Sequence, residues 1–141
     1  MSIRSLLLAN VVVVAAAAPL SAAEADPPRF DPALAADGAR VFRDNCALCH
    51  GAAGKGDGPM AEKLQFAPPD LTTIYRRTRG RFSNEDIQRI IDGRKPLKGH
   101  GGPEMPVWGD ALRNRDEGYS EKRAHAKIQS VVHYLASIQA R

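Results

Sequence analysis

The chain has 141 residues, of which 43% are hydrophobic and 26% are charged, and its formal net charge is +4. These values are typical of an ordinary soluble protein with one domain. The mild basic excess favours an acidic partner surface, but it is too small to indicate nucleic-acid binding by itself. Four Phe, three Tyr and one Trp are available for a core, which leaves room for a large apolar cofactor.

The first 25 residues are predicted to form a signal peptide. Arg4 and the terminal amine give the positive start, and the apolar run that follows is too short to span a bilayer. Small residues allow cleavage after Ala23 or after Ala25. An uncleaved anchor or a buried helix is the alternative. We expect residues 26–141 to be exported to the periplasm as the mature domain, where two lone cysteines would be paired or capped.

The mature domain is predicted to begin with a helix. Asp31 can cap it, and Pro32 suits its first position, where a missing N–H costs nothing. Apolar residues then recur at helical spacing, so the helix is expected to run into Asn45. The Gly-rich stretch 51–59 follows as a loop that lacks the spacing of a phosphate-binding loop. A short helix is expected over residues 60–65.

Further helices are predicted downstream. Ser83 can cap one that ends at Gly93, and one or two helical turns are expected over residues 108–112, after the irregular stretch 99–106. Ser120 can cap the last helix, whose apolar residues recur at helical spacing: Ala124, Ile128, Val131, Val132, Leu135 and Ile138. No segment alternates with period two, so the expected class is all-α, with four to five short helices and long loops. Such loops need something to pack on.

Both cysteines lie in the run NCALCHG, where Cys46 and Cys49 are followed by His50. A zinc site would need four ligands, but there is no second cysteine pair and the other histidines lack finger spacing. A redox dithiol would follow a strand, whereas the preceding segment is predicted helical. A disulfide here would close a tiny loop and stabilise little. The pattern C-x-x-C-H favours covalent haem, with both thiols bonded to vinyl groups and the imidazole bound to iron.

Several motifs together resemble the small bacterial class I (monohaem) cytochromes c. They are GARVF, CALCHG, GKGDGP, PPDLT, MPVWG and VVHYL, and the resemblance covers about residues 32–139. It implies the class I cytochrome c fold, wrapped around one covalent haem c, and electron transfer rather than catalysis. The expected partners are redox proteins, a donor dehydrogenase and an acceptor oxidase or reductase. Neither nucleic acid nor stable membrane insertion is expected.

Met105 is predicted to be the second axial iron ligand, opposite His50. It lies in a loop just before Pro106, within the motif that resembles the family's distal segment, and its soft thioether would raise the potential. A core-filling Met is the alternative. His100 is the rival ligand and would lower the potential, while Met60 is expected to pack. The other histidines are expected on a helix surface: His125 and His133.

The resemblance implies roles for residues around the haem. It places Pro59 on the proximal side, where its carbonyl can accept from His50 Nδ1–H and so orient the ring. Trp108 can donate its indole N–H to a haem propionate. Four arginines could pair with propionates, dock an acidic partner or simply be solvated: Arg76, Arg77, Arg79 and Arg81.

Gly38 and Phe42 resemble the family's helix-crossing pair, in which Gly permits close approach and the aromatic ring packs on the last helix near Tyr134 or Leu135. Two other functions remain open at this point. One is a dedicated cytochrome subunit of a periplasmic dehydrogenase complex. The other is a haem sensor or peroxidase with a displaceable or absent sixth ligand.

Overall fold

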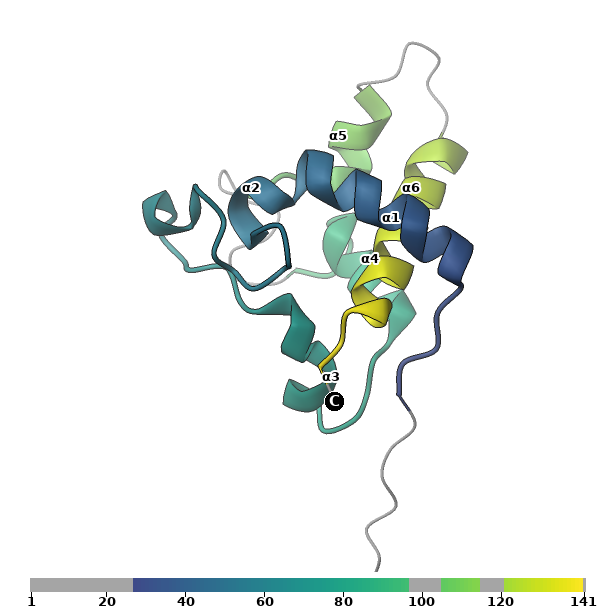
Figure 1. Ribbon diagram of the computed structural model, residues 1–141. Helices are drawn as coiled ribbons and strands as arrows, with labels where there is room; N and C mark the ends of the chain where they lie inside the picture. The colour runs from purple at the N-terminus through teal and green to yellow at the C-terminus, as the bar shows by residue number, and fades with distance from the viewer. Residues whose placement is uncertain (1–26, 97–104, 115–120, 141) are drawn as a thin grey trace, which may run out of the picture.

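The structure is a computed structural model that describes residues 27–96, 105–114 and 121–140 (Figure 1). Some predicted features lie outside these ranges: the signal peptide, His100 and Ser120. In the described ranges the elements are α1 (Pro32–Asn45), α2 (Ala47–His50), the 3₁₀ turns η1 (Ala61–Lys63) and η2 (Leu71–Thr73), α3 (Ile74–Arg77), α4 (Asn84–Ile91), α5 (Trp108–Asn114) and α6 (Glu121–Ser137). No strand occurs among these residues, and the all-α prediction is confirmed.

Helix α1 has the bounds that the sequence predicts. The Asp31 carboxylate accepts hydrogen bonds from the N–H groups of Ala33 at 2.8 Å and Leu34 at 3.1 Å, which satisfies donors that a helix start leaves open. At the other end the Cys46 N–H donates to the Phe42 carbonyl at 2.7 Å. Cys46 therefore sits at the junction between α1 and the helical turn that follows.

Helix α1 lies across α6, and this crossing is the most extensive helix contact of the fold (Figure 1). A Cβ at Gly38 would overlap the Ser130 carbonyl, so only glycine lets the two backbones approach this closely. One turn later the Phe42 ring packs on Tyr134, with centroids 5.1 Å apart and planes tilted by 50°. The predicted helix-crossing pair is confirmed.

Helix α4 is also capped as predicted. Ser83 Oγ accepts from the Asp86 N–H at 3.1 Å, and Ile87 and Ile91 are buried on the inner face. Gly93 follows the helix with φ +83°, a conformation that glycine adopts without steric cost.

Other elements differ from the prediction. The helix expected over 60–65 is only the 3₁₀ turn η1, and α5 runs two residues beyond the expected 108–112. Helices α2 and α3 were not predicted, which is why six α-helices are found in the described ranges instead of four or five. Both are single turns of four residues, too short to give a recognisable apolar period.

The core lies where α1, α4, α5 and α6 converge. Its largest fully buried side chain is Phe42, and the remaining members are mostly aliphatic. Two partly buried residues pack against this cluster: Leu71 of η2 and Met105 from the segment before α5. Among the described residues, none of the helices is both long and apolar enough to cross a membrane.

Candidate functional site

The C-x-x-C-H motif forms a helical turn directly after α1. Helix α2 begins one residue after Cys46, and the N–H groups of Cys49 and His50 both donate to the Cys46 carbonyl, at 3.2 and 2.9 Å. Residues spaced by three and four lie on one face of such a turn. The backbone therefore holds Cys46, Cys49 and His50 within one turn, from which Cys46 and His50 line the cavity described next and Cys49 does not. His50 is buried, with 7% of its surface exposed.

An apolar cavity of about 370 Å³ opens beside this turn. Its volume lies in the range of about 300–1,000 Å³ that is typical of cofactor pockets. Cys46 and His50 line it from the motif side, and Met105 and Trp108 line it from the segment that leads into α5. The rest of the wall comes mainly from apolar residues of α1, α3, α4, α5 and α6 and the segment before α3: Val41, Phe42, Pro69, Leu71, Ile74, Ile87, Ile90, Ile91, Leu112, Ile128, Val131 and Leu135.

His50 and Met105 thus face one cavity although they are far apart in the sequence. Met60, the other methionine considered, is not among the described residues that line it, and its N–H donates to the Leu48 carbonyl at 3.0 Å. His133 points elsewhere, because its Nδ1 accepts from the Asp31 N–H at 2.8 Å. His125 is exposed on α6.

The Gly-rich loop after the motif folds back onto α2. The Gly56 N–H donates to the His50 carbonyl at 2.8 Å. A Cβ at Gly58 would lie 2.5 Å from the Leu48 carbonyl oxygen, so the loop backbone rests directly on the motif. Pro59 lies between Gly58 and Met60, and is therefore held next to the motif turn. Its place on the proximal side of the haem and the hydrogen bond from His50 to its carbonyl both stay predictions.

Burial raises the pKa of the Cys46 thiol to about 12, with a smaller contribution from Cys49. Zinc binding and thiol–disulfide exchange both need a thiolate, and reactive cysteines have lowered pKa values instead. The two cysteines form no disulfide, and no group of three or more His, Cys, Asp or Glu side chains in the described ranges could hold a metal ion. Thioether bonds suit this position, because they leave an uncharged sulfur in a buried place.

The donor set and the cavity together fit a covalently attached haem. The cavity is apolar, a nitrogen donor and a thioether donor face it, and the partly buried Cys46 thiol also lines it. The sequence profile of the family described as Cytochrome c matches residues 35–139, which is most of the chain. The chain belongs to the cytochrome c family. It carries one covalently bound haem c, and the matched domain is an electron-transfer domain.

Two curated relatives resemble part of this cytochrome. The Cbb3-type cytochrome c oxidase subunit FixPc of Rhizobium leguminosarum bv. viciae is 39% identical over 83 residues, which are 58% of this chain and 24% of the relative. The Cbb3-type cytochrome c oxidase subunit FixP of Rhizobium etli matches with the same identity and coverage. The match thus spans about a quarter of the length of each relative.

On one wall of the cavity the sequence analysis named Arg77 but none of the other lining residues. Residues 69–78 supply Pro69, Leu71, Ile74, Arg77 and Thr78 to the lining. The signal was present in Asp70, whose carboxylate accepts from the Thr72 N–H at 2.8 Å and so starts η2. The pKa of Asp70 is lowered, mainly by its hydrogen bond with the Thr72 side chain and further by the charges of Lys55 and Arg77.

Proposed function

We propose that this cytochrome is a periplasmic one-electron carrier. In this proposal the haem is tethered through Cys46 and Cys49, and its iron is bound by His50 and Met105. The observation that carries the proposal is that His50 and Met105, 55 positions apart, line the same apolar cavity next to Cys46. The haem supplies a one-electron couple when bound.

The chain's own residues would perform three tasks. The backbone of α2 fixes His50, so that its imidazole needs no rearrangement between oxidation states. The thioether of Met105 favours reduced iron and raises the potential. With His50 and Met105 both bound to it, the iron would offer no place for a substrate. The apolar wall excludes water, which also favours the less charged reduced state.

The absorption spectrum of the ferric protein tests the ligand assignment. Thioether ligation gives ferric haem c a weak far-red band, and we expect this band in the wild type. It should vanish in Met105→Ala and persist in Met60→Ala, which removes a methionine that does not line the cavity. A high-spin ferric spectrum in the wild type would contradict the carrier function and would favour a sensor or peroxidase.

The periplasmic location rests on the N-terminal sequence. After expression in a bacterium that attaches haem c, the protein should be released by osmotic shock. Its N-terminal residue should be Glu24 or Asp26, according to whether cleavage follows Ala23 or Ala25. An intact N-terminus on a membrane-bound protein would contradict this proposal and leave the uncleaved anchor.

A second candidate function is that of a cytochrome subunit in a redox complex. The 39% identity to subunits of cbb3-type oxidases favours it. Size-exclusion chromatography of extracts from native cells separates the two functions. A free carrier should elute at the size of a monomer, whereas a subunit should coelute with its enzyme.

A further inference from the structure

The chain before Met105 and the chain after it contact each other outside the haem cavity. The contacting residues before Met105 are the pair that follows α4, Asp92 and Gly93. Those after it are Val107, two positions after Met105, and Gly109 in the first turn of α5. Gly93 contacts Val107, and Gly109 contacts Asp92. None of these residues lines the cavity, whereas Met105 and Trp108 do.

Gly93 lies directly against Val107. A Cβ at position 93 would lie 2.6 Å from Cγ1 of Val107, which is closer than Cβ atoms approach in proteins, and 3.0 Å from Cγ2. Gly93 also has φ +83°, a conformation in which any other residue would be strained. The contact therefore has no space for a side chain, and a methyl group at position 93 would displace Val107.

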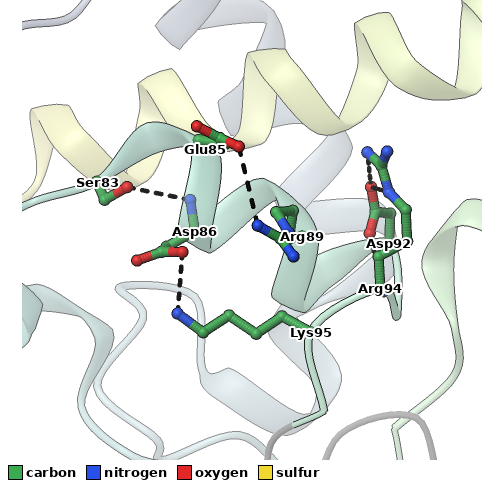
Figure 2. Close-up of polar contacts among 7 residues, drawn as sticks. All are labelled: Ser83, Glu85, Asp86, Arg89, Asp92, Arg94 and Lys95. Atoms are coloured by element: carbon green, nitrogen blue, oxygen red, sulfur yellow. Dashed lines mark hydrogen bonds and ion pairs between the residues drawn. The ribbon is translucent and has the colours of Figure 1, made fainter.

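Asp92 holds the same junction from the other side. A Cβ at Gly109 would lie 3.0 Å from the Asp92 carbonyl oxygen and 3.3 Å from its Cβ, so the first turn of α5 rests on Asp92. The Asp92 side chain is only 9% exposed. Its carboxylate accepts from the Arg94 N–H at 3.0 Å and from Arg94 Nε at 2.7 Å, and Arg94 Nη2 also donates to it (Figure 2). These bonds fix the chain direction after α4.

A second ion pair on α4 offers a matched control. Lys95 Nζ lies 2.9 Å from Asp86 Oδ1, and both side chains are nearly half exposed (Figure 2). This pair also closes the turn after α4, but Asp86 is not among the atoms nearest to a Cβ built at Gly93 or at Gly109. Its loss should affect the turn without moving the start of α5.

We propose that Asp92 and Gly93 are positioning residues for Met105. They hold Val107 and Gly109 in place, and thereby set the backbone from which the thioether reaches the cavity. This inference rests on the proposed role of Met105 as an iron ligand. Because Met105 and Val107 are two residues apart, a displacement at Val107 is transmitted to the ligand over very few backbone bonds. A poorly held ligand is displaced more readily by a competing one.

Imidazole is the probe for this competition. Ferric holo-cytochrome is titrated with imidazole, and the loss of the far-red thioether band gives the apparent affinity. We expect Gly93→Ala and Asp92→Asn each to raise that affinity about tenfold, and Asp86→Asn to leave it within about twofold of the wild type. In Gly93→Ala, the further change Val107→Ala removes the two nearest methyl groups and should return the affinity most of the way to that of the Val107→Ala single variant.

The outcomes separate this inference from the ligand assignment. If the wild type shows the thioether band but neither Gly93→Ala nor Asp92→Asn changes the imidazole affinity, the positioning role is wrong and Met105 remains the ligand. An equal rise in Asp86→Asn would likewise overturn it, as a general loosening of the turn. If the wild type lacks the band, the ligand role itself fails and this inference fails with it. Urea unfolding of each variant shows whether a rise in affinity exceeds what lost stability explains.

Discussion

Gly38 of α1 lies against the Ser130 carbonyl of α6 so closely that a Cβ at position 38 would overlap the carbonyl oxygen. The Gly38 backbone and the Ser130 carbonyl each belong to a helix, so neither can move aside without shifting that helix. The same crossing places Phe42 between Tyr134 and the haem cavity, because Phe42 lies one turn after Gly38 and lines the cavity wall. The approach of the two helices therefore sets one wall of the haem site.

Gly38→Ala should destabilise the holo-cytochrome even though alanine is the better helix former. Overpacking a buried contact costs about 1–3 kcal/mol, and a Cβ only 1.9 Å from a backbone oxygen places the cost at the upper end of this range, above the gain of about 1 kcal/mol from helix propensity. The free energy of unfolding in urea measures the difference. Asp37→Ala, at an exposed neighbouring position of α1, is the control and should change that free energy by less than about 1 kcal/mol. Equal stability of Gly38→Ala and the wild type would show that the crossing can relax.

Phe42→Ala should lower the free energy of unfolding by about 3–5 kcal/mol, because it removes a ring that is 2% exposed and leaves a cavity beside the haem. Phe66→Ala is the matched control. Phe66 is 39% exposed, so the same truncation there should cost less than about 1 kcal/mol. Equal losses in the two variants would contradict the core position of Phe42. Both are measured by urea unfolding of the holo-protein.

The sequence was sufficient to predict the elements that carry their own local signals. Asp31 with Pro32 marks the start of α1, Ser83 marks the start of α4, and Gly93 marks its end, and all three are confirmed. These signals work because a cap is a local hydrogen bond or a local backbone conformation. The C-x-x-C-H motif predicted the haem in the same way, since its chemistry lies within five consecutive residues.

The sequence could not predict what depends on tertiary packing. Helix α3 has only four residues, so no apolar period identifies it, and its place in the cavity wall follows from how η2 turns the chain. The contact of Gly93 with Val107 joins a residue before Met105 to a residue after it, and no local sequence pattern at either residue indicates it. The preference for Met105 over Met60 as the ligand came largely from family resemblance, and of these two methionines Met105 is the one that lines the cavity.

The stabilising effect of Asp92 should depend on pH. Burial alone would raise its pKa, but the hydrogen bonds and charge of Arg94, with a smaller effect of His125, outweigh burial and lower it. A carboxyl whose pKa is lower in the folded state stabilises the fold above its unfolded value of about 3.9, and loses this effect as the pH falls through the folded value. The loss of stability in Asp92→Asn should thus be present from about pH 7 to about pH 5 and shrink below about pH 4.

Urea unfolding of the wild type and Asp92→Asn over this pH range measures the effect. The difference at neutral pH should be on the order of 1 kcal/mol, since the Arg94 side chain is largely exposed and the pair is screened by water. A difference that stays the same down to about pH 3 would mean that the amide disrupts packing and that the charge of Asp92 contributes nothing.

Arg77 should raise the midpoint potential of the haem. It is the arginine of the 76–81 group that lines the cavity, and its positive charge opposes the extra positive charge of ferric iron. Arg77→Gln should therefore lower the potential. At a separation of roughly 10 Å through a largely aqueous path the interaction is about 0.5 kcal/mol, or on the order of 20 mV for a one-electron couple.

Arg76→Gln removes the same charge from an exposed neighbour that does not line the cavity, and should lower the potential less. Spectroelectrochemical titration at low and high salt measures both, and the difference between the variants should narrow at high salt because exposed charges are screened. Equal shifts in the two variants would mean that net charge alone sets the effect and that the position of Arg77 at the cavity has no part in it.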